Sequence, residues 1–319
     1  MNIELLIEHN SKLYQPIVED GIQWTTERAG SPSTLKFTVI KDDVIAFQEG
    51  DPVRLRVDGN NVFYGFVFTK KRNKDHHIEV TAYDQLRYLK NKDTYVYENK
   101  TASQFIKMIA DDFALNTGTI ESTKHVIESR VEDNQSLFDM IQNALDLELQ
   151  TNGEMYCLFD DFGKLTLKNI ASMKLDLLID GETAEDFDYT SSIDQNTYNQ
   201  IKLTYDNEEA GEREVYISKD SANINSWGVL QYYEKLQKGE NGKTKADALL
   251  KLYNKKTRNL KVNDCFGDLR CRAGTMVPVQ LYLGDVTVSN YLLVEKATHT
   301  FNNDHHVMSL NLRGGEFVV

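Results

Sequence analysis

Two triplets of acidic and histidine side chains have the composition of a metal site. They are Asp75-His76-His77 and Asp304-His305-His306. Metallophosphoesterases use similar triplets as ligands, but that chemistry needs further aspartates and histidines gathered on a parallel sheet. The other histidines are scattered, at positions 9, 125 and 299. We therefore interpret both triplets as polar hairpin tips, and we expect no metal and no cofactor.

Two pairs of adjacent carboxylates, Asp111-Asp112 and Asp160-Asp161, are candidates for acid catalysis. Glycoside cleavage requires two acids that face each other across a sugar. The first pair falls on the polar side of a predicted helix and the second in a predicted β turn, so we interpret both as solvated surface. Serine nucleophile motifs and phosphate-binding loops are also absent from the sequence. No catalytic residue is assigned, and we expect a protein that is not an enzyme.

The three cysteines, Cys157, Cys265 and Cys271, form an odd set without paired spacing. Such a set is typical of a reducing cytosol, because disulfide frameworks use paired cysteines at regular spacings. Cys265 and Cys271 are near enough in sequence to share a metal, but no histidine or third cysteine stands beside them. We interpret all three as buried or incidental thiols.

The overall charge limits the classes of partner. The chain has 319 residues and a formal net charge of −13, which argues against general nucleic-acid binding because phosphate contacts need a positive face. The N-terminus has neither a basic start nor a long apolar run, so it does not resemble a signal peptide. No apolar stretch approaches the ~20 residues that cross a bilayer, so no membrane insertion is expected.

Three domains are predicted from the periodicity of apolar residues. Residues 1–98 alternate in short runs around the hairpin turn at Asp58-Gly59, which predicts a β barrel or sandwich. Residues 99–185 contain the capping box Thr101 to Gln104, a second helix that ends near Gly153, and two strands, which together predict an α+β domain. Residues 186–319 are predicted to be strand-like again, with a helical insertion at about 238–260.

An internal repeat relates the first and last of these domains. In both, a glycine, Gly50 or Gly274, precedes a strand, a turn, a second strand, one of the two triplets as a polar tip, and a third strand. We infer two related antiparallel β barrels separated by the α+β domain. The predicted fold class is therefore α+β and mainly β. Three copies of such a chain would present six similar faces around one axis.

Three stretches, with this order of elements, resemble the baseplate hub family of contractile-tailed phages. They are Gly21 to Phe37, Gly50 to Val57, and Leu249 to Leu312. The family includes late control protein D, the PBSX-type prophage tail hub and the N-terminal part of type VI secretion spikes, and the PBSX-like branch is the most similar. The resemblance covers nearly the whole chain.

The resemblance implies a homotrimeric, pseudo-hexameric adaptor with tube-type barrels. Its partners would be the hexameric tail tube protein, the central spike protein and other baseplate proteins. The chain would be made in the bacterial cytoplasm and then belong to a virion or bacteriocin particle. The alternatives are a tail-associated cell-wall hydrolase and a carbohydrate- or receptor-binding β protein.

A compact basic run precedes the first triplet in this acidic chain. It consists of Lys70, Lys71, Arg72 and Lys74. One interpretation is a solvated hairpin whose charges discourage strand pairing at an edge. The other is an electrostatic contact with an acidic rim of the tube, the spike or a neighbouring subunit. The sequence leaves both open.

Overall fold

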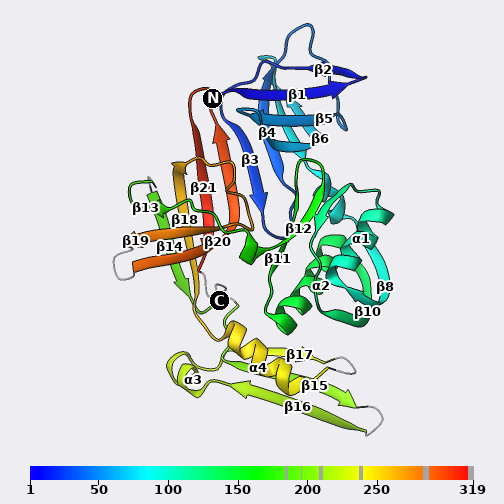
Figure 1. Cartoon of the computed structure of the whole chain (residues 1–319), viewed down its shortest axis with the longest axis vertical. Helices are drawn as coiled ribbons and strands as arrows, with labels where there is room; N and C mark the ends of the chain where they lie inside the picture. Colours follow the sequence, from blue (N-terminus) through cyan, green and yellow to red (C-terminus); the bar gives the residue numbers. More distant parts are fainter. Residues whose placement is uncertain (184–185, 195, 208–210, 237–239, 283–286, 315–319) are drawn as a thin grey trace.

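The structure, a computed structural model, describes residues 1–319 apart from 184–185, 195, 208–210, 237–239, 283–286 and 315–319. Long strands dominate and the described helices are few and short, so the predicted mainly β class is confirmed. Figure 1 shows two groups of long strands, an α/β region beside them and a small sheet at the far end. No described helix has the length and apolar character needed to cross a bilayer.

The first strand group has a buried core formed by alternating side chains. The turn at Asp58 and Gly59 has φ values of +48° and +79°, as the predicted tight hairpin requires. Its strands are β1 (Ile3–His9), β2 (Lys12–Tyr14), β3 (Ile22–Glu27), β4 (Thr34–Ile40), β5 (Pro52–Val57), β6 (Asn60–Arg72) and β7 (His77–Tyr83).

The α/β region follows along the chain. Thr101 and Gln104 form the predicted capping box, and Gly153 ends the second helix with φ +70°. Its elements are η1 (Gln85–Lys90), β8 (Lys92–Thr101), α1 (Ala102–Asp112), β9 (Thr117–Ile120), β10 (Val126–Ser136), α2 (Leu137–Asn152), β11 (Tyr156–Asp160), β12 (Leu165–Asn169) and η2 (Ile170–Ser172).

The second strand group contains an inserted three-stranded sheet. The main strands are β13 (Ile179–Asp180), β14 (Asp186–Ser192), β18 (Thr257–Phe266), β19 (Met276–Tyr282), β20 (Thr287–Phe301) and β21 (His306–Arg313). The insertion contains β15 (Gln200–Asn207), β16 (Glu212–Lys219), α3 (Ser221–Trp227), β17 (Gln231–Lys235) and α4 (Gly242–Tyr253). The expected domain boundary at residue 185, and residues 238 and 239 of the expected insertion, lie outside the described residues.

Both strand groups belong to one sheet. Its order is β14-β18-β21-β20-β3-β4-β7-β6-β5-β1-β2, and β13 and β19 pair beside β20. The two groups meet where β3, from the first part of the chain, pairs antiparallel with β20, from its last part. Within the described residues this path is open at β14 and β2, so the strands of a single chain do not form the two closed barrels that we expected.

The same five-strand arrangement occurs twice in this sheet. The order β3-β4-β7-β6-β5 in the first group corresponds to β14-β18-β21-β20-β19 in the second. Gly50 donates its N–H to Val67 at 2.7 Å, and Gly274 donates to Val294 at 2.8 Å. The two glycines that the repeat singled out therefore precede equivalent strands, β5 and β19, and have φ values of +91° and +92°.

Alanine at these two glycines provides a matched test of local packing. Gly50→Ala should lose about 1–2 kcal/mol of stability, because a left-handed backbone disfavours Cβ. Gly274→Ala should lose a further ~1–3 kcal/mol from overpacking, because a Cβ at this position would lie 2.5 Å from Cys157 Sγ. At Gly50 no other atom lies within 4 Å of the added Cβ. Thermal unfolding of both variants measures this order, and equal losses would contradict it.

Candidate functional site: the seam and the open edges of the sheet

The seam between β3 and β20 joins residues far apart in the sequence, with 273 positions between Thr25 and Thr298. Thr25 lies opposite Thr298, and their hydroxyl oxygens are 3.2 Å apart. Beside this pair, Lys296 Nζ donates to Glu27 at 2.8 Å. Backbone pairing, a hydroxyl contact and an ion pair therefore fix the register of the seam.

A second ion pair closes one end of the seam. Arg28 Nε donates to Glu295 at 2.7 Å, and both side chains are largely shielded from solvent. The backbone N–H of Arg28 also donates to the carbonyl of Glu295 at 2.9 Å. A charge-assisted contact in such surroundings is stronger than one at an open surface.

Buried rings pack on the face of the seam that carries Trp24 and His299. His299 is fully buried and stacks on Trp24 with ring centroids 4.9 Å apart. Its Nε2–H donates to the carbonyl of Cys271 at 2.7 Å, and its Nδ1 is 2.9 Å from Nε2 of His306, which is then the donor. Burial and the nearby His306 lower the pKa of His299 to about 3, so the ring is neutral at physiological pH.

The second triplet is divided between this core and the solvent. His306 is half-buried, and burial lowers its pKa to about 4. Asp304 and His305 are exposed at the hairpin tip, where His305 Nδ1 is 2.6 Å from Asp304 Oδ1. One member of the triplet therefore supports the seam and the other two face solvent.

The first triplet has different contacts. His76 has φ +65° at the β6–β7 tip, and Arg72 donates to its Nδ1 at 2.7 Å. His77 Nδ1 is 2.9 Å from Glu19, while Asp75 is exposed. Across the described parts of the chain, no three His, Cys, Asp or Glu side chains gather as a possible ligand set.

The basic run occupies the end of β6 and its tip. Lys70 packs its ammonium 4.5 Å from the centre of the Phe47 ring. Lys71 is 3.2 Å from Glu79, and both side chains are largely exposed. Arg72 and Lys74 are also exposed. These four cations lie beside the part of β6 that pairs only with β7 among the described strands.

One of the carboxylate predictions is wrong. Asp160 is only 6% exposed, because β11 carries it into the junction between the α/β region and the sheet. Its carboxylate accepts from Gln85 at 2.8 Å and from the N–H of Gly163 at 2.6 Å. The predicted β turn wrongly included this residue, which instead ends the buried strand. Asp161, Asp111 and Asp112 are exposed, as expected.

This junction holds a buried charge cluster that sequence reasoning missed. Arg272 lies 3.9 Å from the centre of the Phe159 ring and donates to the carbonyl of Asp160 at 3.1 Å. Burial and the neighbouring Asp160 raise the pKa of Asp84 to about 8. The three cysteines are buried and free, and Cys157 packs against Gly274 at the same junction.

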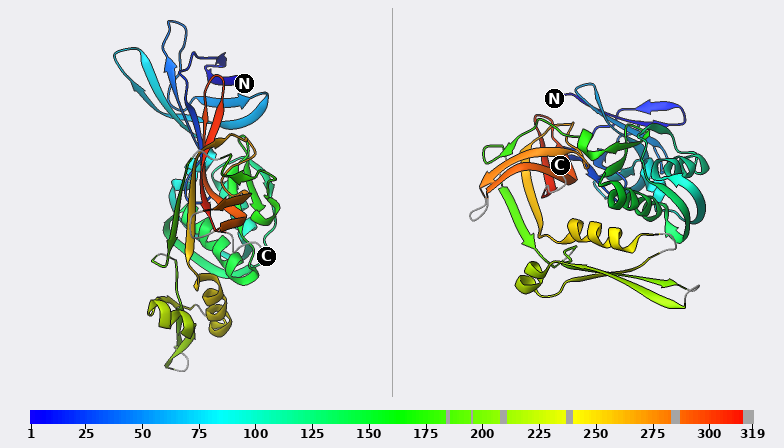
Figure 2. Two further views of the ribbon diagram at one scale, coloured as in Figure 1. Left: turned by 90° about the vertical axis from the view of Figure 1, so that its left-hand side faces the viewer. Right: turned by 60° about the horizontal axis from the view of Figure 1, so that its bottom comes forward.

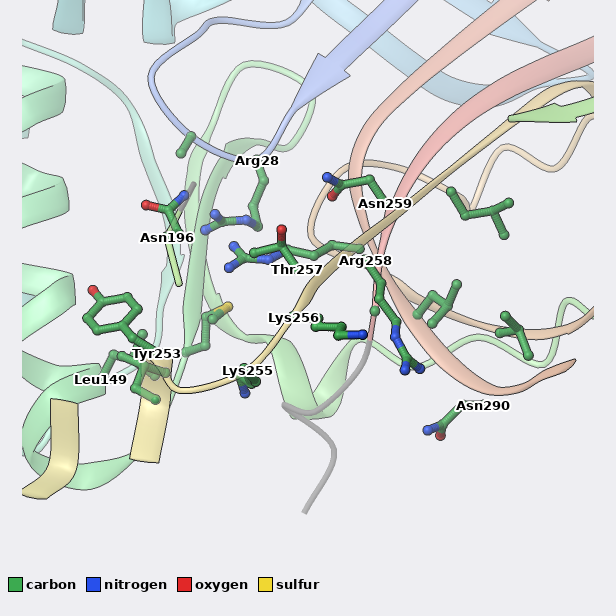
Figure 3. Close-up of a pocket in the computed structure, with 18 of the residues that line it drawn as sticks. Arg28, Leu149, Asn196, Tyr253, Lys255, Lys256, Thr257, Arg258, Asn259 and Asn290 are labelled. Carbon is green, nitrogen blue, oxygen red and sulfur yellow. The ribbon is translucent and has the colours of Figure 1, made fainter. Parts of the chain in front are cut away.

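A cavity of about 620 Å³ lies where the insertion meets the main sheet. Figure 3 labels lining residues from several elements: Arg28 after β3, Leu149 on α2, Tyr253 on α4, Arg258 on β18 and Asn290 on β20. Its wall is mixed in polarity, with apolar side chains beside amides and cations. Because these groups come from separate regions, the cavity marks a junction between them.

A family comparison matches most of this chain. A family model described as YQBQ-like covers residues 22–313. The chain belongs to the YQBQ-like family. This YQBQ-like chain is 28% identical over 320 residues to the phage-like element PBSX protein XkdQ of Bacillus subtilis strain 168, a match that covers 97% of the chain and 96% of that protein. The predicted similarity to the PBSX-like branch is confirmed.

Solved structures share the fold of this YQBQ-like protein. The 43 kDa tail protein of prophage MuSo2 from Shewanella oneidensis matches with a TM-score of 0.72 and 12% identity, over 97% of this chain and 98% of that one. The c3393 protein of E. coli, a component of the type VI secretion system, matches with a TM-score of 0.58 and 13% identity, over 98% and 78%. At these identities the likeness establishes the fold alone.

The seam of the YQBQ-like fold predicts a pH dependence. The pKa of His299 is about 6.5 in the unfolded chain and about 3 in the folded protein. Between these pH values the unfolded chain binds a proton that the folded ring does not, so the free energy of unfolding falls as pH falls. His299→Gln should reduce this slope by up to about 1.4 kcal/mol per pH unit. Denaturant unfolding between pH 7 and 4 measures it. Equal slopes in His299→Gln and in the unsubstituted protein would refute the assignment.

Proposed function

We propose that this protein is the structural baseplate hub of a contractile phage-type tail. The observation that carries the proposal is the five-strand arrangement that occurs twice and is joined edge to edge in one sheet. A trimer of such chains presents six similar units around its axis, so it can dock on a hexameric tube while keeping threefold symmetry below. Membership of the YQBQ-like family, with a relative from the phage-like element PBSX, supports this role.

The proposed trimer also accounts for the open sheet. A tube-type barrel needs its strand edges paired, and a single chain leaves its sheet open within the described residues. In a ring, the edges of neighbouring chains would pair and the units would close together. We retain the division into residues 1–98, 99–185 and 186–319 as an interpretation, in which the outer two supply the tube-type units.

The proposed partners follow from this position. The tail tube protein would stack on the ring, the central spike protein would lie below it, and other baseplate proteins would surround it. Assembly would take place in the bacterial cytoplasm before the hub joins its particle. The c3393 protein itself exhibits structural similarity to the T4 bacteriophage tail proteins gp27 and gp5, which is consistent with a place in a tail-like assembly.

The proposed role requires no catalytic site. A cell-wall hydrolase would need acids that face a substrate, whereas Asp84 and Asp160 interact inside the protein. Asp84 accepts backbone N–H groups from Ser33 and Leu86, each at 3.1 Å. These carboxylates therefore serve the packing of the junction.

The purified chain should form a ring of three copies. Mass measurement in solution should give three times the monomer mass, and electron microscopy should show a ring with six similar lobes on one face. The expected interface exceeds about 2,000 Å². A strictly monomeric chain, both alone and mixed with tail tube protein, would refute the hub.

Activity assays separate the hub from its rivals. Zymography on cell-wall material should show no lysis by the purified protein, and glycan arrays should show no binding by the monomer. Lysis by the purified, folded protein would instead favour a hydrolase, and glycan binding by the monomer would favour a carbohydrate-binding protein.

A further inference from the structure

Within the described residues, two strand edges lack the neighbour that their counterparts have. Between Lys296 and Phe301, β20 pairs with β21 on one edge and with β3 on the other. The corresponding part of β6, from Thr69 to Arg72, pairs with β7 only among the described strands. In the same way β3 lies between β4 and β20, while its counterpart β14 pairs only with β18 in the described part of the chain. An unpaired edge is a template for another strand.

The register of the repeat identifies the counterparts on β6 and β20. Val67 and Val294 make the same pair of backbone bonds to the segments that begin with Gly50 and Gly274. Both strands then carry an irregularity one residue later, at the same place in their pairing with β7 and β21. Counting on from it, Lys71 corresponds to Thr298 and Arg72 to His299.

The same reasoning relates β14 to β3. Lys36 of β4 pairs with the β7 residue that follows the irregularity, and Lys261 of β18 pairs with the β21 residue at the same place, so the two lysines are counterparts. On the other side Lys36 pairs with Gln23 and Lys261 with Asp188. Asp188 therefore corresponds to Gln23. The next positions follow in order, so that Tyr189 corresponds to Trp24 and Thr190 to Thr25.

Side-chain exposure agrees with a missing neighbour on β14. Phe187 is 37% exposed, whereas Ile22, its counterpart on β3, is 2% exposed. Trp24 is also buried, while Tyr189 is only partly so. The positions on β3 lie beside β20. The matching positions on β14 have no such neighbour among the described strands.

We propose that β14 of one chain pairs antiparallel with the second half of β6 of the next chain, repeating between subunits the seam that β20 and β3 form within one. In this register Lys71 lies opposite Thr190, and Arg72 lies opposite Tyr189. The contact joins two different edges of the sheet, β14 on one chain and β6 on the next, so it is head-to-tail. Only the closure at three copies rests on the proposed hub function.

Charge complementarity selects a second copy as the occupant of each edge. The β6 edge carries the basic run, and the β14 edge carries Asp186 and Asp188, both exposed. The register places Asp188 opposite Asn73, and Lys71 is the neighbouring residue of β6 on the same face of the sheet. Opposite charges along paired edges favour this contact and disfavour pairing of either edge with itself.

In the proposed contact, Arg72 and Tyr189 take the places that His299 and Trp24 have in the seam within the chain. Within the chain, His299 stacks on Trp24 across the seam. Between chains, the guanidinium of Arg72 would lie over the ring of Tyr189, an arrangement in which the cation is attracted by the negative face of the ring. Phe187 would become buried beside it. The basic run is thus assigned to a subunit interface.

Cysteine cross-linking tests the register directly. Lys71→Cys protein mixed with Thr190→Cys protein should give a disulfide-linked dimer after mild oxidation, and the double variant should give a covalent trimer on a non-reducing gel. Lys71→Cys mixed with Ser191→Cys is the matched control, because a shift of one residue places the thiol on the other face of the strand. Thr25→Cys/Thr298→Cys should cross-link within one chain and confirm the template seam.

The outcomes distinguish the seam from the hub. A native trimer without the Lys71–Thr190 cross-link, or with an equal cross-link through Ser191, overturns the seam and leaves the hub standing. A ladder of species beyond three supports the seam and contradicts threefold closure. A monomer with no cross-link at any protein concentration, both alone and mixed with tail tube protein, overturns both.

Charge exchange provides a second readout that needs no disulfide. Asp186→Lys/Asp188→Lys should weaken self-association about ten-fold or more at low salt, and Lys71→Glu/Lys74→Glu should do the same. Combining all four substitutions in one chain should restore association. The control Asp111→Lys/Asp112→Lys makes the same change of charge on α1 and should have no effect. Failure of the combined variant to recover, in folded protein, contradicts the proposed pairing.

Discussion

The pairing of β3 with β20 is the constraint on which the rest of the structure depends. Backbone N–H and C=O groups at a strand edge must be hydrogen-bonded to another strand or to water. Here β3 and β20, which are far apart in the sequence, provide these hydrogen bonds for each other. The two strand groups consequently share one sheet, and their relative orientation is set by hydrogen bonds. Figure 2 shows the result from two further directions, with the long sheet extending from the first strand group toward the inserted sheet.

Buried polar groups reinforce this arrangement where the regions meet. His299 is held neutral between a carbonyl, a second histidine and an indole ring, and Arg272 is enclosed near Asp84 and Asp160. Each group is costly to bury without its partners, so these clusters favour one packing of the strand groups and the α/β region over looser alternatives. Gly274 belongs to the same junction, because Cys157 occupies the space that a side chain would need.

The repeat gives the open edges a physical meaning. Among the strands that the structure describes, each type of edge is paired in one five-strand unit and unpaired in the other. The free edges carry opposite charges, and the chain would use one type of contact both inside and between subunits. Duplication of a fold can in this way encode an interface between subunits.

The sequence alone determined the local structure, because local structure depends on neighbouring residues. The capping box at Thr101, the turn at Asp58-Gly59 and the two glycines of the repeat follow from backbone preferences that act over a few positions. It also supplied the basic run, but it could not choose between a solvated hairpin and an interface. Only the tertiary structure placed Asp160 inside, brought His299 onto Trp24, and left the edges of β6 and β14 unpaired among the described strands. Strand pairing between distant segments depends on register across the whole sheet, and that register is a property of the folded chain.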